Sequence, residues 1–86
     1  MNPHEVVIYP MMTERSIYMI ENENKLVFIV NHNASKQDIS KAIETLYGVE
    51  VESVNTLITR KTEKKAFVKL KEAYDASDLA IRLGLL

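Results

Sequence analysis

The chain has 86 residues, of which 47% are hydrophobic, with no cysteine and a formal net charge of −1. This length suits a single domain over residues 1–86, and the apolar content excludes a wholly disordered chain. The lack of cysteine excludes disulfides and thiolate metal sites. No apolar run reaches the roughly 18 residues that a membrane span requires, and the start has no signal-peptide pattern. We therefore expect a compact, soluble, cytoplasmic domain.

The first third of the chain predicts a strand, a helix and a second strand. Residues 6–9 are a short β-rich run that Pro10 closes. Thr13 can cap a helix that ends near Asn22, in a polar run. The five consecutive apolar residues Leu26–Val30 are too short for a helix, so they predict a central strand that is covered on both faces.

The clearest helix begins after Ser35, which has capping-box spacing with Asp38. Apolar residues then recur at helical spacing, namely Ile39, Ala42, Ile43, Leu46 and Tyr47. Gly48 is a natural helix stop. This pattern predicts a helix with one apolar stripe that ends at Tyr47.

The rest of the chain predicts a hairpin and a last helix. Residues 51–60 form a long strand, residues 61–63 a short connection, and residues 64–70 the antiparallel return strand. Asp75 can cap a helix that Gly84 terminates. The predicted order is β-α-β-α-β-β-α, an α+β plait with a mostly antiparallel four-stranded sheet and helices packed on its faces.

The charge is distributed unevenly. Six of the eleven basic residues, but only one acid, lie between residues 55 and 71, and these bases are Arg60, Lys61, Lys64, Lys65, Lys69 and Lys71. Such a distribution predicts an anionic partner. Strand alternation places Lys65, Phe67, Lys69 and Lys71 on one side, which suits phosphate binding with a base stacked on the ring.

No pattern for catalysis or metal binding is present. His4 and His32 are isolated, and the chain has neither a nucleophile motif nor a glycine-rich phosphate loop. Glu50 and Glu52 are more typical of a solvated strand edge than of a catalytic pair. We therefore expect a binding module that is not an enzyme and uses no cofactor, metal or small-molecule substrate.

Two classes of binding protein fit the residues in part. Residues 27–31 match five positions of the first-strand signature of an RNA-recognition motif, and residues 66–68 match part of its third-strand signature. The strand at residues 6–9 would then occupy the place of the fourth strand. The alternative is an acidic protein–protein adaptor whose basic hairpin grips an acidic partner, as the net charge of −1 would allow.

Several motifs resemble the ribosomal protein L23 family of the large subunit. Residues 64–71 read Lys-Lys-Ala-Phe-Val-Lys-Leu-Lys and are followed after seven residues by Leu79. The family's Pro-x-x-Thr-Glu-Lys-Ser motif is matched at residues 10–16, with Arg15 in place of lysine. Residues 33–36 and 49–56 resemble a helix start and a strand of the family, and the end of the chain resembles its archaeal branch.

This resemblance implies a small α/β plait that binds large-subunit rRNA beside the polypeptide exit tunnel, among neighbouring large-subunit ribosomal proteins. Members of the family form a docking site for nascent-chain factors such as signal recognition particle. Glu14 holds the position of the family's factor contact, although an acid there also favours its own helix N-terminus. Members of the family are usually basic, whereas this chain has a net charge of −1. Bacterial members also have a longer hairpin, so a tunnel-lining role is not expected for the short hairpin of this chain.

The resemblance and the charge pattern together assign the rRNA contacts. Lys64 and Lys65 are the first choice, and Arg60, Lys61, Lys69 and Lys71 follow. Lys36 opposes the dipole at the start of its helix, which indicates an external partner. Asn55 and Thr56 can bond either to RNA or to a neighbouring strand, and Phe67 can stack on a base or pack in the core.

Overall fold

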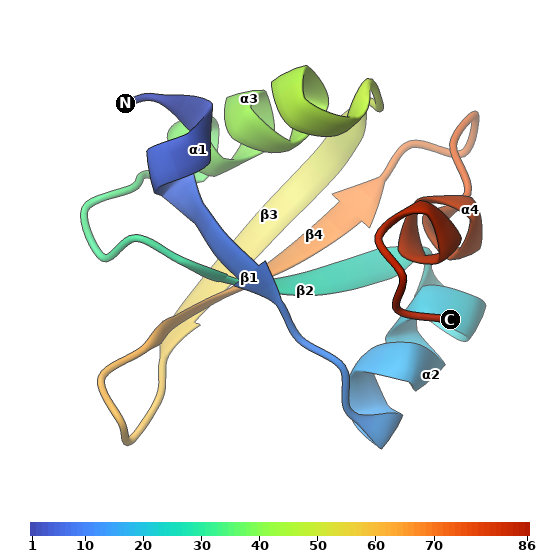
Figure 1. The fold of residues 1–86 in the computed structure, drawn as a ribbon, viewed down its shortest axis with the longest axis horizontal. Helices are drawn as coiled ribbons and strands as arrows, with labels where there is room; N and C mark the ends of the chain where they lie inside the picture. The colour runs from blue at the N-terminus through green and yellow to red at the C-terminus, as the bar shows by residue number, and fades with distance from the viewer.

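The computed structural model describes residues 1–86 and contains four helices and four strands (Figure 1). In chain order these are α1 (Pro3–Val6), β1 (Val7–Pro10), α2 (Glu14–Glu23), β2 (Lys25–Val30), α3 (Lys36–Tyr47), β3 (Val51–Ile58), β4 (Lys64–Leu70) and α4 (Ala76–Arg82). The strands form one sheet in the order β1-β2-β4-β3, and every neighbouring pair is antiparallel. The predicted α+β plait with a four-stranded sheet is confirmed.

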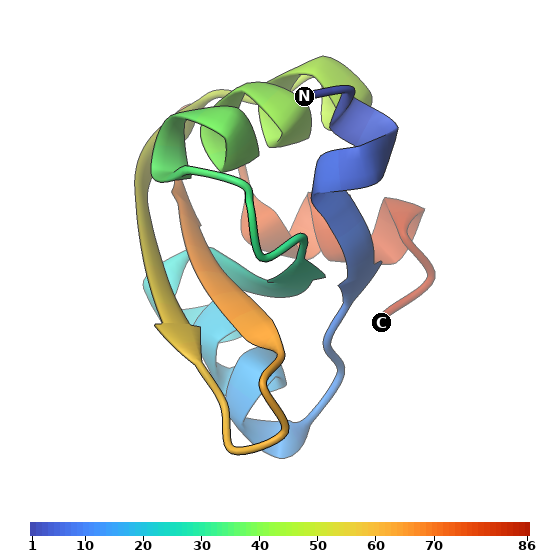
Figure 2. The same ribbon diagram turned by 90° about the vertical axis from the view of Figure 1, so that its left-hand side faces the viewer.

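The hydrophobic core lies on one face of the sheet. Alternate side chains of β2 and β4 point into it, and these are Leu26, Phe28, Val30, Ala66, Val68 and Leu70. The apolar stripes of α3 and α4 cover them, with Ile39 and Leu79 among the fully buried residues. Figure 2 shows α3 at one end of the twisted sheet and the tip of the β3–β4 hairpin at the other.

The opposite side of β2, β4 and β3 forms what we call the open face. It carries Lys25, Val27, Ile29, Lys65, Phe67, Lys69, Ser53, Asn55 and Leu57. Val27 and Ile29 are nevertheless buried, so β2 is covered on both faces as its continuous apolar run predicted. The residues of β4 and β3 on this face remain partly or largely exposed.

The helix caps follow from local sequence. Both Thr13 and Ser35 form capping boxes, in which the residue three positions later returns a side-chain hydrogen bond to the cap. Gly48 ends α3 in the left-handed region at φ 67°, where a side chain would be strained. Asn24 ends α2 in the same region at φ 56°, one residue beyond Glu23. The helix thus extends slightly past the predicted end near Asn22.

Two other predictions were wrong. The sequence analysis missed α1, which Asn2 caps by accepting a hydrogen bond from the His4 N–H and which has Pro3 at its first position. Val6 therefore belongs to a helical turn, and the first strand begins one residue later. The strand β3 ends at Ile58 rather than Arg60, because the chain turns over residues 59–62, where the Thr62 N–H bonds the Thr59 carbonyl.

Candidate nucleic-acid interface

The open face brings lysines and one aromatic ring to adjacent positions. In the pairing of β2 with β4, Lys25 lies opposite Lys69 and Val27 lies opposite Phe67. The Lys65 ammonium lies 6.0 Å from the centroid of the Phe67 ring, within the range of a cation–π contact. The predicted placement of Lys65, Phe67 and Lys69 on one side of a strand is confirmed. Lys71, which was expected on the same side, lies beyond the end of β4 at Leu70.

The strand β3 adds a polar and an apolar side chain to the same face. Asn55 lies opposite Phe67, and Leu57 lies opposite Lys65. Asn55 is exposed, and its side-chain amide makes no hydrogen bond within the chain. Thr56 faces the other side of the sheet, opposite Ala66. The structure thus places Asn55 on the open face beside Phe67 and Thr56 on the core side of β3.

Lys64 and Lys65 lie on opposite faces of β4. The Lys64 ammonium donates a hydrogen bond of 2.6 Å to the Ala34 carbonyl, and it lies 3.5 Å from the His32 carbonyl. Both carbonyls belong to the loop between β2 and α3. Lys64 therefore ties this loop to the sheet, whereas the Lys65 ammonium has no partner other than an aromatic ring.

Ion pairs engage the lysines at the end of β4 far from the hairpin tip. Lys69 pairs with Glu52 at 3.4 Å and Lys71 with Glu50 at 3.3 Å. Lys25 pairs with Glu23 at 3.4 Å. Exposed pairs of this kind contribute about 0–1 kcal/mol, so the lysines could exchange these partners for phosphates at small cost.

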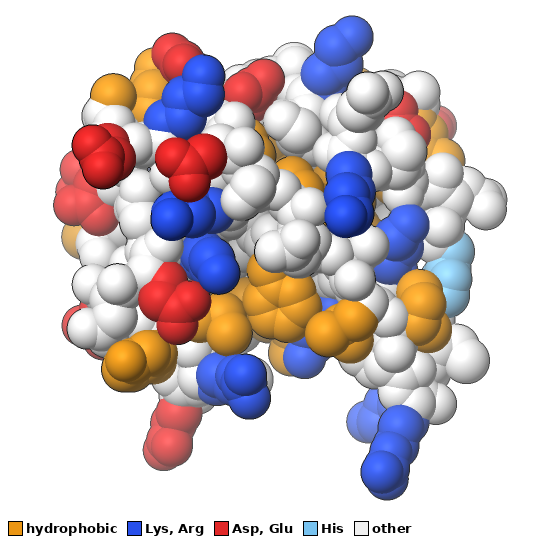
Figure 3. Space-filling view, turned by 180° about the vertical axis from the view of Figure 1, so that it is seen from behind, with side chains coloured by type: hydrophobic (Ala, Val, Ile, Leu, Met, Phe, Trp, Pro, Cys, Tyr) orange, Lys and Arg blue, Asp and Glu red, His pale blue; other side chains and the backbone are white.

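The acids gather at the same end of the molecule. A hollow of about 360 Å³ beside Lys69 is lined by Glu21, Glu23, Glu52, Glu72 and Asp75. In Figure 3, acidic side chains cluster on the left, whereas two basic side chains project at the lower right, where the hairpin tip lies. The surface is therefore polarised along the strands, and its positive end is the hairpin end.

Six basic side chains have no hydrogen bond or ion pair within the chain. Arg60 and Lys61 stand at the exposed hairpin tip, Arg15 lies in the first turn of α2, Lys36 and Lys41 belong to α3, and Lys65 belongs to β4. Sequence reasoning treated Arg15 only as a substitute within a motif, and it did not single out Lys25. Their positions depend on how α2 and β2 pack against β4, which no local pattern reveals.

A small groove separates α2 from the open face. Its volume is about 200 Å³, and its walls include Met19, Val27, Leu57 and Phe67. Arg15 and Lys65 also line it, and none of its lining residues is acidic. The groove therefore combines an apolar floor with two cations.

Side-chain contacts hold the tip of the hairpin against the rest of the sheet. The Tyr9 hydroxyl donates a hydrogen bond of 2.9 Å to Glu63, and the His32 ring contacts the Thr62 carbonyl. The hydrogen bond to Glu63 raises the pKa of Tyr9, because an ionised phenol would face a carboxylate. Thr62 itself adopts the left-handed region at φ 61°. The short tip is thus positioned by β1 and the β2–α3 loop.

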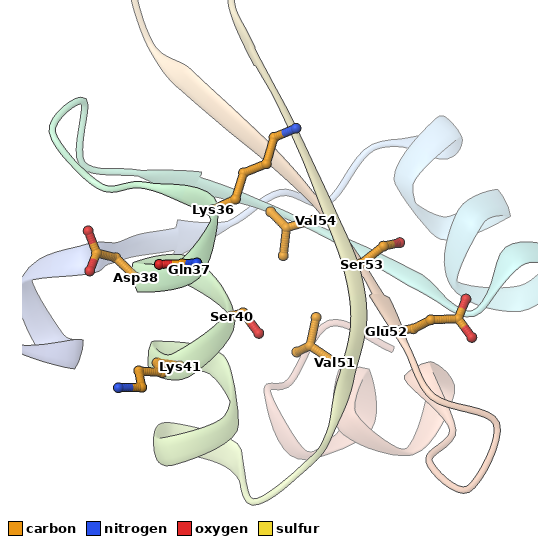
Figure 4. A pocket seen from close by; sticks show the side chains of 9 residues that line it. All are labelled: Lys36, Gln37, Asp38, Ser40, Lys41, Val51, Glu52, Ser53 and Val54. Atoms are coloured by element: carbon orange, nitrogen blue, oxygen red, sulfur yellow. The ribbon is translucent and has the colours of Figure 1, made fainter.

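The largest groove, of about 480 Å³, lies between α3 and β3. Figure 4 shows Val51 and Val54 pointing toward α3, whereas Glu52 and Ser53 point away from it. Lys36 lines this groove, so the structure does not bring it to the open face with Lys65.

Other kinds of site receive no support from the structure. No three histidine, cysteine or acidic residues gather closely enough to hold a metal ion. None of the helices combines the length and the apolar character that crossing a membrane demands.

An RNA-recognition motif would need the aromatic side chain of its first-strand signature on the open face. Phe28 occupies that position but points into the core, where it is fully buried and stacks on Tyr47 with a centroid distance of 6.1 Å. The strand β1 does lie at the edge beside β2, as that alternative expected. The strand positions are therefore shared, but the first-strand ring of the base-stacking platform is not on the open face.

Comparison with known proteins identifies the family. The family model for Ribosomal protein L23 matches residues 5–77. The large ribosomal subunit protein uL23 of Methanococcus aeolicus is 45% identical over 85 residues, which cover 99% of this chain and 99% of that protein. These matches confirm the resemblance seen in the motifs, the ribosomal location and the expectation that the chain is not an enzyme. The chain belongs to the ribosomal protein L23 family.

Proposed function

We propose that this protein is a structural component of the large ribosomal subunit that binds large-subunit rRNA through the hairpin half of its open face. The observation that carries this proposal is the unpaired positive charge there. Lys65 and Arg15 flank Phe67 on the open face, and Arg60 and Lys61 stand at the hairpin tip. Lysines and arginines that neutralise phosphates release counterions, which supplies most of the affinity for nucleic acid.

The polarised surface also explains how a chain with a net charge of −1 can bind RNA. The acids around Lys69 lie at the far end of the strands, so they repel RNA from that end and favour one orientation. Lys69 and Lys71 lie among these acids and are ion-paired. We therefore rank Lys69 and Lys71 below Lys65, Arg60 and Lys61 as rRNA contacts. Lys36, which lines the groove beside α3, and Lys64, which bonds the Ala34 carbonyl, are ranked below them as well.

We further propose that the protein lies beside the polypeptide exit tunnel and helps to dock nascent-chain factors such as signal recognition particle. Glu14 is exposed at the start of α2, next to Arg15 in sequence. Met12 and Tyr18 are large apolar side chains nearby in the chain, and they are 51% and 59% exposed. An acid beside exposed apolar side chains is a fitting surface for a protein partner. Because the hairpin tip is short, we do not propose a tunnel-lining role.

Gradient sedimentation of a cell lysate tests the assembly. Co-migration with the large subunit after a moderate salt wash would support a core component, and recovery only in the light fractions would contradict it. The RNA surface is tested by replacing Lys65, Arg60 and Lys61 with alanine and measuring binding to the organism's large-subunit rRNA. We expect the slope of log affinity against log salt to fall by about 0.7–0.9 for each lost phosphate contact.

The matched control replaces Lys36 and Lys41 with alanine, since both line the groove on the other side of β3. This control should keep most of the affinity and slope. Equal losses per removed charge in the two variants would contradict the placement of the interface on the open face and would indicate only a general effect of net charge.

A further inference from the structure

We infer that the groove between α2 and the open face receives one unpaired nucleobase, stacked against Phe67, with Arg15 and Lys65 on the phosphates that flank it. This inference rests on the proposed binding of rRNA and names the part of the RNA that this groove would recognise. It also gives Arg15 and Met19, which belong to α2, a direct role in the interface.

The lining of the groove selects this ligand. Apolar contacts to a flat ring come from Met19, Val27, Leu57 and Phe67. The cations Arg15 and Lys65 at the same site would attract negative charge beside that ring. A nucleotide within a chain combines a planar apolar ring with a phosphate on each side. An apolar protein side chain would fill the same walls but would leave both cations without a partner, since no acid lines the groove.

The size of the groove favours a single base. Its volume of about 200 Å³ is below the range of about 300–1,000 Å³ that is typical of pockets for drug-sized ligands. Bases within an RNA duplex are stacked and paired, so only a nucleotide from a loop, bulge or end can insert.

The contact of Lys65 with the ring is weak enough to be replaced. Its ammonium lies 6.0 Å from the Phe67 centroid at the protein surface, where a cation–π contact contributes less than a base stack does. When Lys65 turns to a phosphate, the ring is free for the base. Asn55 lies directly across from Phe67 with an unbonded amide, so it is placed to contact the polar edge of that base.

The experiment compares Phe67→Leu with Phe67→Tyr in binding to the full large-subunit rRNA. Leucine keeps an apolar side chain but loses the ring, so we expect affinity to fall about tenfold with an unchanged salt slope, because no charge is lost. Tyrosine keeps the ring and should bind like the unchanged protein. The matched control is Tyr18→Leu, which removes an exposed ring of α2 that does not line the groove.

The unchanged protein provides a second measurement that does not depend on the folding of a variant. Large subunits are irradiated with ultraviolet light, and the peptides that carry a covalently attached nucleotide are identified by mass spectrometry. We expect attachment at Phe67 or Met19.

The outcomes separate this inference from the function on which it rests. If Phe67→Leu binds normally and attachment occurs only at the hairpin tip, the base site is overturned while rRNA binding stands. If Phe67→Leu assembles normally but the subunits lose a neighbouring or docked protein, the groove is a protein site and the inference is again overturned. If the unchanged protein does not bind rRNA, the proposed function itself fails.

Discussion

Lys64 and Ala34 are joined by a hydrogen bond of 2.6 Å from the lysine ammonium to the backbone carbonyl, thirty residues apart in the chain. This contact fixes the loop before α3 against the first residue of β4. It also directs the Lys64 charge away from the open face, where the next residue, Lys65, contacts Phe67. Two consecutive lysines therefore carry different roles.

This separation predicts opposite effects of two matched substitutions. Lys64→Met should lower the free energy of unfolding by about 1–2 kcal/mol, because the carbonyls lose a charged donor. Its salt slope for rRNA binding should remain unchanged. Lys65→Met should leave stability nearly unchanged and reduce that slope by about 0.7–0.9. Chemical denaturation and filter binding measure the two quantities, and equal slopes in both variants would contradict the assignment.

A second prediction concerns Asn24, whose amide connects the end of α2 to the loop before α4. Its side chain donates to the carbonyls of Leu70 and Tyr74 and accepts from the Ala76 N–H at 2.7 Å. Asn24→Gly keeps the left-handed backbone and loses these bonds, so we expect a loss of about 2–3 kcal/mol. Asn24→Ala should lose about 1 kcal/mol more, because alanine is strained at φ 56°.

Thermal unfolding measures both variants, with Asn24→Asp as the control. Aspartate can still accept from the Ala76 N–H but sets a carboxylate oxygen against the carbonyls of Leu70 and Tyr74, so it should be clearly less stable than the unchanged protein. If glycine were as stable as asparagine at this position, the backbone conformation and not the side-chain bonds would explain the residue.

Most of the fold was predictable because local and periodic signals agreed. The capping box of Ser35 with Asp38, the apolar stripe and Gly48 together define α3. The alternation in β4 correctly separated Phe67 from Ala66 and Val68. The turn α1 was missed because it is only four residues long, and its cap at Asn2 has no apolar repeat behind it.

The candidate site was less predictable, since strand alternation gives a side chain's face but not its partners. Alternation correctly places Lys64 on the face of β4 opposite Lys65. Its hydrogen-bond partner, however, lies in the β2–α3 loop, and only the tertiary fold brings that loop close to β4. The same holds for Arg15, which reaches the open face because α2 packs beside β2 and β4. The uneven charge was visible in the sequence, but the ion pairs that occupy Lys69 and Lys71 were not.

A third prediction concerns the dependence of stability on pH. The backbone and side chain of Ser35 hydrogen-bond the Asp38 carboxylate and lower its pKa below the usual 3.8. A lowered pKa contributes stability that is fully present above pH 3.8 and is lost as the pH falls through the folded-state value. Asp38→Asn should therefore destabilise the protein near neutral pH, and this difference should shrink in acid.

Unfolding free energies of the two proteins from about pH 6 to about pH 3 test this expectation. Asp78→Asn, which changes the acid in the first turn of α4, is the control for a general loss of negative charge. A difference between Asp38→Asn and the unchanged protein that is the same at every pH would show that the charge of the carboxylate is not what stabilises the cap.

A fourth prediction separates the two surfaces that begin at neighbouring residues of α2. Glu14→Gln should leave incorporation into the large subunit unchanged, because Thr13 still caps the helix and the loss at its N-terminus is only about 0.3–1 kcal/mol. Purified large subunits with this variant should bind signal recognition particle more weakly, by about tenfold if the carboxylate forms a buried ion pair with the factor. Glu21→Gln, an exposed acid further along α2, should not change binding. Normal recruitment by Glu14→Gln would leave that residue with the role of favouring its own helix, whereas loss of assembly would place it in the rRNA interface beside Arg15.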